Sequence, residues 1–203
     1  MSDVEEVLLG AVVGYLIGTF PSADLVTRLV SRGAVDIRES GSGNPGGLNA
    51  MRVLGRKWGA LVMLLDTLKG VVAGFVGLAI GDAAAYAAGT AAIAGHVWPV
   101  WTRFRGGRGV ATAGGSFLSV FPPFFPIAAV FALVVTLIRR RPAFTVVLVC
   151  PLWVAAAVVW WAADLSNWWG PEPSAGLLVY AVLGALMVLA RFRSSARSGA
   201  GLG

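Results

Sequence analysis

The chain has 203 residues, of which 57% are hydrophobic and only 13% are charged. Soluble domains carry about 25% charged residues, so an ordinary soluble domain is excluded, and the high hydrophobicity excludes a disordered chain. One cysteine, Cys150, excludes an intramolecular disulfide. We expect an all-α integral membrane protein that forms a single domain over residues 1–203, with a flexible tail at residues 194–203.

Seven apolar runs approach the length needed to cross about 30 Å of hydrocarbon. They lie near residues 7–30, 59–80, 84–102, 110–121, 124–138, 143–163 and 175–192. The fourth and fifth are short, and residues 121–126 (FPPFFP) between them cannot continue one straight helix. We expect two spans joined by a tight turn. The alternative is one long kinked helix, which gives six spans.

The distribution of positive charge favours seven spans. All 16 lysine and arginine residues fall on one side of this layout or in the adjoining half of a span, and segments 1–6, 81–86, 119–126 and 162–175 have none. By the positive-inside rule, the N-terminus lies outside and the C-terminus in the cytoplasm, as in a multi-pass protein of the plasma membrane. Six spans would put the Arg139–Arg141 cluster on the wrong side. The net charge of +6 is then a topology signal and needs no nucleic-acid partner.

Charged residues also occur within the expected spans. Asp66 and Lys69 lie at i, i+3, and Asp24 and Arg28 lie at i, i+4. Ionisable groups inside a membrane generally face a partner or a polar cavity. Asp24 and Arg28 form either a neutralising pair or part of a polar site, and for Lys69 we favour a cavity that reaches in from the cytoplasmic loops. Ser22, after a proline, indicates a break in the first span on the same side.

The first cytoplasmic loop, residues 38–52, has the composition of an anion site. Residues 40–49 contain four Gly, two Ser, two Asn and one Pro. Exposed N–H groups in glycine-rich turns form anion-binding nests. Arg52, Arg56 and Lys57 are expected at or near a helix start, where the helix dipole also favours an anion. The loop therefore predicts phosphate or carboxylate binding, and the alternative is a flexible connector.

The second cytoplasmic loop, residues 95–112, contains Arg105 and Arg108 on either side of Gly106 and Gly107. Two cations beside exposed backbone donors suit a second phosphate. The alternative is a set of ordinary cytoplasmic arginines. His96, the only histidine, is either structural or catalytic. No metal site and no cofactor are expected.

These motifs resemble a known family. Residues 41–49 (GSGNPGGLN), 52–57 (RVLGRK) and 66–70 (DTLKG) resemble the first signature of the PlsY family, the bacterial membrane acyl-phosphate:glycerol-3-phosphate acyltransferases. Residues 95–99 (GHVWP) and 104–112 (FRGGRGVAT) resemble the second signature, and residues 15–23 (YLIGTFPSA) also match. The resemblance implies seven spans with the N-terminus outside, in agreement with the distribution of charge.

The resemblance also implies an activity. An acyl group would pass from acyl phosphate to the 1-hydroxyl of glycerol 3-phosphate, giving lysophosphatidic acid and phosphate, the first step of phospholipid synthesis. Neither metal nor acyl-CoA is needed, and we expect a monomer that works beside membrane lipid. The expected catalytic residues are Ser42, Asn44, Arg52 and His96. The expected substrate- or phosphate-binding residues are Ser22, Gly41, Gly43, Gly46, Asn49, Lys69, Arg105, Gly106, Gly107 and Arg108.

The chain departs from the family pattern at its C-terminal end. The third signature is not recognisable, and Phe192 and Ser195 stand where the family has His and Asn. Arg191, Arg193 or Ser195 would have to rebuild that part of the site. Two alternatives therefore stay open: a diverged or inactive homologue with another acceptor, and a small-anion transporter.

Overall fold

The computed structural model describes residues 1–140 and 142–197, which form helices and connecting turns without a β-strand. The helices in these ranges are α1 (Asp3–Gly18), α2 (Ser22–Val30), α3 (Gly47–Leu54), α4 (Arg56–Ile80), α5 (Asp82–Val97), the 3₁₀ helix η1 (Val100–Thr102), α6 (Val110–Val120), α7 (Phe124–Arg139), α8 (Pro142–Ala162) and α9 (Ala175–Arg197). Arg141 of the expected basic cluster lies outside the described residues, as does the end of the expected tail.

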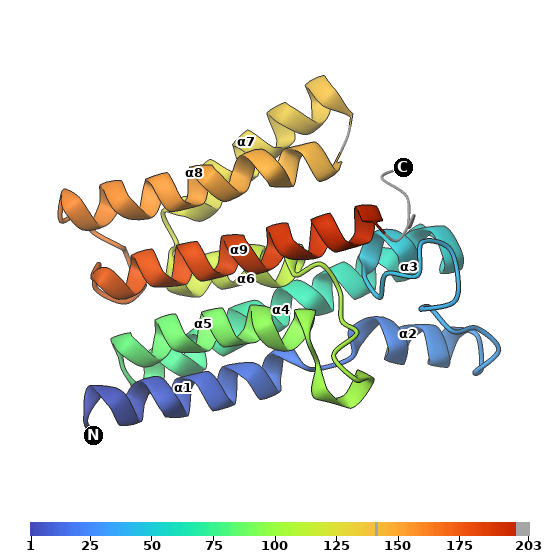
Figure 1. The fold of residues 1–203 in the computed structure, drawn as a ribbon, viewed down its shortest axis with the longest axis horizontal. Helices are drawn as coiled ribbons and strands as arrows, with labels where there is room; N and C mark the ends of the chain where they lie inside the picture. Colours follow the sequence, from blue (N-terminus) through green and yellow to red (C-terminus); the bar gives the residue numbers. More distant parts are fainter. Residues whose placement is uncertain (141, 198–203) are drawn as a thin grey trace.

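Four segments of the described chain are long and apolar enough to cross a bilayer: Asp3–Val30, Arg56–Ile80, Ala143–Ala162 and Ala175–Arg193. α6 and α7 are apolar but shorter, with 11 and 16 residues. The long helices run side by side along the molecule (Figure 1). The N-terminus lies at one end, and α2, α3 and the C-terminal end of α9 lie at the other.

Proline positions explain where several helices end. α6 stops at Val120 and α7 starts at Phe124, so the expected break between two separate helices is confirmed. The span expected at residues 84–102 is shorter than expected, because α5 ends at Val97, just before the Trp98-Pro99 step. A residue that precedes proline is disfavoured in the helical region, which accounts for the early end.

The first span is interrupted, as Ser22 indicated. α1 ends at Gly18 and α2 begins at Ser22, because Pro21 lacks an N–H group and its ring clashes with the preceding turn. Thr19 Oγ1 accepts a hydrogen bond from Trp101 Nε1 at 3.0 Å, which ties the break to the turn after α5. This break places α2 and the loop that follows it beside the second cytoplasmic loop.

Small residues allow α1 and α5 to approach closely. The contact is made by Gly10, Gly14 and Gly18 of α1 against Ala84, Ala88 and Ala92 of α5. The four-residue spacing puts each set on one helix face, and small residues at such spacing are a common interface between membrane helices. A Cβ atom on Gly14 would lie 2.3 Å from the Ala88 carbonyl oxygen. No larger residue fits there without moving one helix.

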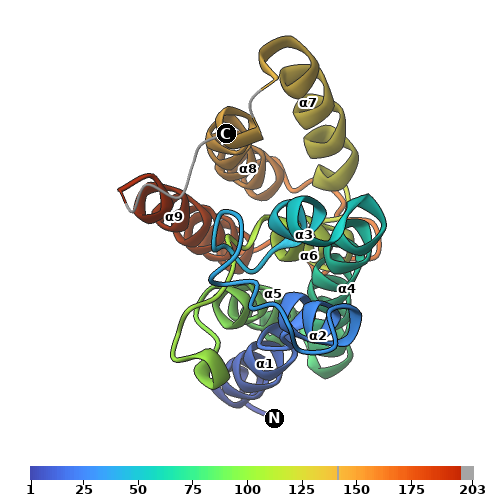
Figure 2. The same ribbon diagram turned by 90° about the vertical axis from the view of Figure 1, so that its right-hand side faces the viewer.

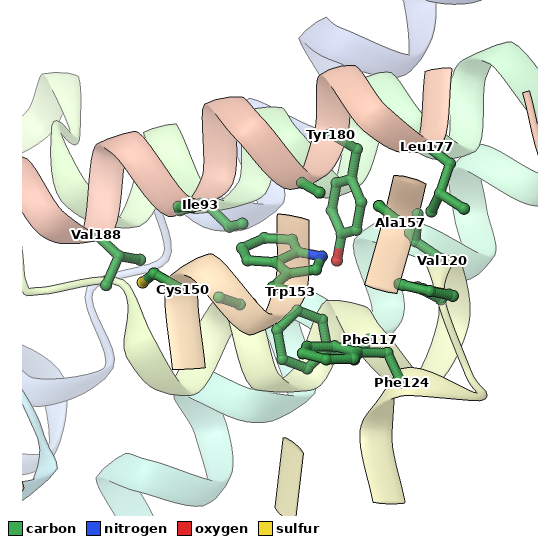
Figure 3. Close-up of a cluster of buried hydrophobic side chains, with 14 of the residues drawn as sticks. Ile93, Phe117, Val120, Phe124, Cys150, Trp153, Ala157, Leu177, Tyr180 and Val188 are labelled. Carbon is green, nitrogen blue, oxygen red and sulfur yellow. The ribbon is translucent and has the colours of Figure 1, made fainter. Parts of the chain in front are cut away.

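An aromatic core joins α6, α8 and α9 (Figure 3). Trp153 is fully buried and packs edge-on against Phe117 and Tyr180, with ring centroids 4.7 and 4.9 Å apart. The Tyr180 hydroxyl lies 2.6 Å from Ser116 Oγ, so the buried polar atom has a partner. α7 and α8 form a hairpin on the side of the molecule away from α1 and α2 (Figure 2). α8 reaches the rest of the bundle mainly through this core and α9.

We expect Gly14→Val to destabilise the protein by roughly 1–3 kcal/mol or more, because its side chain would overlap the α5 backbone. Thermal unfolding in detergent micelles measures the effect. Val12→Ala is the matched control, since Val12 lies on the same helix with 58% of its surface exposed. Equal unfolding temperatures for Gly14→Val and the control would contradict the close approach.

Candidate active site

A buried cluster of three ionisable side chains joins α4 to α5. The Lys69 ammonium lies 3.0 Å from Asp66 Oδ1, one turn away on α4. His96, in the last turn of α5, places Nδ1 3.5 Å from the same oxygen. All three side chains are buried. For Lys69 the sequence favours a polar cavity; Lys69 does line the smaller cavity described below, and it also pairs with Asp66. The carboxylate has a second partner in His96.

Lys69 also holds the interrupted first span. Its ammonium donates to the Phe20 carbonyl at 3.1 Å. Phe20 lies in the break between α1 and α2, and its carbonyl also accepts from the Ser22 amide at 3.0 Å. An ammonium has three donors, and two are used here on Asp66 and Phe20. At most one N–H of Lys69 is left for another ligand.

Asn49 gives the first cytoplasmic loop its shape. Its Oδ1 accepts from the Ser42 amide at 2.7 Å. Its Nδ2 donates to the carbonyls of Ile37 and Ser40 at 3.1 and 2.9 Å. Gly41 adopts φ +60° directly above this side chain, and a Cβ atom there would lie 2.3 Å from Asn49 Oδ1. Asn49 is therefore an internal support that presents Ser42 and its neighbours.

The expected nest of exposed N–H groups in this loop is wrong for three amides. The Ser42 amide bonds to Asn49, the Gly43 amide to the Ser40 carbonyl, and the Gly46 amide to the Asn44 carbonyl. Buried backbone groups need partners, and the turns of this loop supply them internally. Side chains rather than these amides are left to contact an anion.

The expected loop also contains a helix. Residues 47–54 form α3, and Arg52 lies in its last turn rather than at a helix start. The positive end of the helix dipole therefore does not assist Arg52. Arg56 and Lys57 do begin a helix, since they are the first residues of α4. Neither of them lines the cavities described below.

Arg38 connects the two cytoplasmic loops. Its guanidinium forms an ion pair with Asp24 of α2 and donates from Nε and Nη2 to the Arg105 carbonyl at 3.2 and 3.1 Å. Partial burial and the positive charge of Arg105 lower the pKa of Arg38 from its usual value. Asp24 was expected either to pair with Arg28 or to line a polar site. The second alternative is confirmed, because Asp24 lines the smaller cavity described below. Its ion-pair partner is Arg38, which lies farther along the chain and reaches back to α2.

The glycines of the second loop are not exposed donors, which corrects the expectation for them. The Gly106 amide donates to the Val97 carbonyl and the Gly107 amide to the His96 carbonyl, both at 3.1 Å. These two carbonyls end α5 and would otherwise lack partners. The side chain of Arg105 is exposed and lines neither cavity. Of the two expected cations of this loop, only Arg108 faces the site.

Arg108 stands among positive charges. Half-burial lowers its pKa, and the charges of Arg52 and Arg191 lower it further, although a guanidinium stays protonated. Its Nε is buried without a hydrogen-bond partner in the described structure. The guanidinium carbon lies 4.8 Å above the ring of Phe192. Clustered cations and a buried donor without a partner favour the binding of an anion at this point.

A cavity of about 1210 Å³ separates α3, α4 and α6 from α8 and α9. Its polar lining is Ser42, Asn44, Asn49, Arg52, Asp66, Thr67, His96, Arg108, Arg140 and Arg193. Its apolar lining follows α6, α8 and α9, and on α8 it extends from Phe144 to Val154, roughly 15 Å along the helix axis. The cavity is therefore amphiphilic, with donors and cations in one part and a hydrocarbon-like wall in the other.

A second cavity of about 20 Å³ lies on the other side of His96, at the break between α1 and α2. Ser22, Lys69, Arg38, Gly106 and Gly107 contribute to its lining. The Ser22 hydroxyl is buried and has no partner among the described groups. The volume suits about one water molecule. Asp66 and His96 line both cavities.

The expected site residues therefore fall into three groups. The large cavity is lined by Ser42, Asn44, Gly46, Asn49, Arg52, His96 and Arg108, and the small one by Ser22, Lys69, His96, Gly106 and Gly107. Gly41, Gly43 and Arg105 line neither. Sequence reasoning missed Arg38 and Arg140, which line the small and the large cavity. Arg191 and Arg193, considered only as replacements for the third signature, also lie at the site, and the side chain of Ser195 lies outside the described residues.

Comparison with known proteins gives a consistent result. The model of the glycerol-3-phosphate acyltransferase family matches residues 8–199. The Rubrobacter xylanophilus glycerol-3-phosphate acyltransferase is 39% identical over 197 residues, covering 95% of this chain and 90% of that protein. The enzyme of the same name from Thermoanaerobacter pseudethanolicus is 41% identical over 134 residues, 66% of this chain and 67% of that protein. The match to a Dehalococcoides mccartyi relative spans 63% of each.

Two crystal structures of PlsY, an integral membrane glycerol 3-phosphate acyltransferase, resemble this fold. The glycerol 3-phosphate form superposes with a TM-score of 0.75 and the lysophosphatidic acid form with 0.76. Both are 28% identical in sequence, and each match covers 94% of this chain and 90% of the other. The likeness therefore covers most of the length of both chains.

We expect Asp66→Asn to lower the free energy of unfolding by about 3–5 kcal/mol, because it leaves the buried Lys69 ammonium without a carboxylate. Adding Lys69→Met should recover most of the loss, since the uncompensated charge is removed. Unfolding in detergent measures both variants. Asp24→Asn is the control, because its ion pair with Arg38 is partly exposed and worth at most about 1 kcal/mol. A further loss in the double variant would refute the pairing.

Proposed function

The chain belongs to the glycerol-3-phosphate acyltransferase family, and we propose that this membrane acyltransferase moves an acyl group from acyl phosphate to the 1-hydroxyl of glycerol 3-phosphate. The products are lysophosphatidic acid and inorganic phosphate. The observation that carries the proposal is the amphiphilic cavity, whose cationic part and apolar wall match the two ends of an acyl phosphate. The glycerol-3-phosphate acyltransferases and PlsY structures that resemble the chain support the acceptor.

The orientation in the membrane follows from the same proposal. Seven membrane crossings place the N-terminus outside and the C-terminus in the cytoplasm of a bacterial cell, with the site facing the cytoplasm. The positive-inside distribution of Lys and Arg supports this arrangement. We further propose that the protein acts as a monomer.

Acyl phosphate is a mixed anhydride and is already activated, so the protein needs no acyl-enzyme. The acceptor hydroxyl oxygen bonds to the acyl carbon, the bond from that carbon to the phosphate oxygen breaks, and the hydroxyl proton leaves on the departing phosphate. The work of the protein is to hold two anions in contact and to stabilise the charge on the acyl oxygen and the leaving phosphate.

The roles are divided between the two loops. Ser42, Asn44 and Arg52 hold the phosphate of the donor and polarise its carbonyl, and Arg108 holds the phosphate of the acceptor. The buried Nε of Arg108, which lacks a partner, supports its role. His96 borders the reacting groups, and Asp66 fixes its ring. Gly41, Gly43 and Gly46 shape the first loop, while Lys69 and Ser22 line the small cavity beside His96.

We expect purified protein in lipid to release phosphate from palmitoyl phosphate only with glycerol 3-phosphate, and to form lysophosphatidic acid. Ser42→Ala and Arg52→Ala should each lower the rate by roughly 100-fold or more, since each removes a donor to developing charge. Arg56→Ala is the matched control, because this exposed arginine lines neither cavity.

Two outcomes would contradict the proposal. Full activity in folded Ser42→Ala or Arg52→Ala would remove these residues from the chemistry. Absence of acceptor-dependent release by folded wild-type protein would mean that the acceptor is another hydroxyl compound or that the chain is not a catalyst.

A further inference from the structure

The C-terminal part of α9 is hydrogen-bonded to the second loop. Arg191 Nη2 donates to the Gly106 carbonyl at 2.6 Å, and Arg191 Nε donates to the Gly107 carbonyl at 3.3 Å. The amides of the same two glycines are bonded to the Val97 and His96 carbonyls at the end of α5. Both edges of the Gly106–Gly107 backbone are therefore held, one by α5 and the other by the forked guanidinium on α9.

The space around this backbone is narrow. A Cβ atom on Gly106 would lie 2.0 Å from the His96 carbonyl oxygen. One on Gly107 would lie 2.2 Å from His96 Nε2 and 3.1 Å from the Pro45 carbonyl oxygen of the first loop. The loop is thus seated between α5 and the first loop, and Arg191 closes the open side. Any shift of this backbone moves Arg108, the next residue.

Phe192 supports Arg108 directly. The ring face lies 4.8 Å from the guanidinium carbon, within the range of a cation–π interaction. Arg108 and Phe192 line the same cavity. Because Arg52 and Arg191 repel the Arg108 charge, an attractive surface on one side of the guanidinium holds it beside the cavity that the ring also lines. The adjacent residues of α9 therefore act on two consecutive parts of one loop.

We infer that Arg191 and Phe192 are positioning residues for acceptor binding: Arg191 sets the Gly106–Gly107 backbone, and Phe192 sets the Arg108 guanidinium that receives the acceptor phosphate. The inference rests on the proposed function. It also offers a physical explanation for the departure from the third family signature: at the end of α9, the aromatic ring of Phe192 and the guanidinium of Arg191 act in place of the signature residues.

The test measures KM and kcat for both substrates in four variants. Arg191→Lys keeps the charge but has no fork to bond two carbonyls, so the KM for glycerol 3-phosphate should rise roughly 10-fold or more, the loss expected for one charged hydrogen bond. Phe192→Leu keeps the apolar volume but loses the ring face, and the same KM should rise about 3- to 10-fold. Phe192→Tyr and Arg56→Lys are the matched controls and should resemble the wild type. The KM for palmitoyl phosphate should change less than about twofold in all four.

A double-mutant cycle shows whether Phe192 acts through Arg108. In an Arg108→Ala background, Phe192→Leu should raise the KM for glycerol 3-phosphate no further, because the ring has no guanidinium left to hold. If Phe192→Leu raises the KM for glycerol 3-phosphate by the same factor with and without Arg108, the role assigned to Phe192 is overturned. The inference is likewise contradicted by a wild-type KM in Arg191→Lys, or by equal increases in the KM for both substrates, since either outcome indicates general charge or general packing.

Failure of the proposed function is distinguished from failure of this inference. If wild-type protein forms no lysophosphatidic acid, inorganic phosphate is used as the probe, and its stabilisation of the protein against heat is measured across a concentration series. Phosphate should stabilise the wild type and Phe192→Tyr at concentrations about 3- to 10-fold lower than Phe192→Leu. Identical phosphate dependence in these proteins would overturn the positioning role, whatever the natural acceptor.

Discussion

The Asp66 carboxylate lies within an apolar helix bundle, where an unpaired charge would cost several kcal/mol. Lys69 and His96 share one of its oxygens and so tie α4 to α5. Lys69 continues this network to the Phe20 carbonyl at the break between α1 and α2. The first cytoplasmic loop leaves α2 and the second leaves α5. The relative position of the two loops that form the site therefore depends on how this one carboxylate is partnered.

In both loops, several backbone amides form hydrogen bonds that hold the structure of the protein itself. Asn49 closes the first loop, and the amides of Gly106 and Gly107 close the end of α5. An anion in the large cavity is then met mainly by side chains, above all the guanidinium groups of Arg52 and Arg108. Loops that are held by their own hydrogen bonds and carry cations next to an apolar wall are preorganised for two negatively charged substrates, because little has to reorganise when charge develops.

Local features of the sequence anticipated much of this protein. The apolar runs predicted most of the helices, and the prolines predicted the breaks at Pro21 and before Phe124. The occurrence of Asp66 and Lys69 within one span predicted a polar site there, and both residues line a cavity. These features could be predicted because they depend on one helix or one turn at a time. The composition of the two loops likewise predicted anion binding, and the resemblance to the family implied Ser42 as a catalytic residue; Ser42 and Arg108 line the same cavity.

The tertiary structure decided what depends on contacts between distant segments. From the sequence, Arg28 was the candidate partner of Asp24. In the structure Arg38 pairs with Asp24, because the first loop turns back toward α2. The sequence predicted a free amide at Gly106, but the loop turns back on α5 and the Gly106 amide donates to the Val97 carbonyl. It gave no role to a phenylalanine in α9, because the cation that Phe192 holds lies in another loop. The sequence by itself determined most of the helices, their apolar character and the residue types at the site. Which polar side chains pair with one another was decided by the tertiary structure, because it depends on how the helices pack.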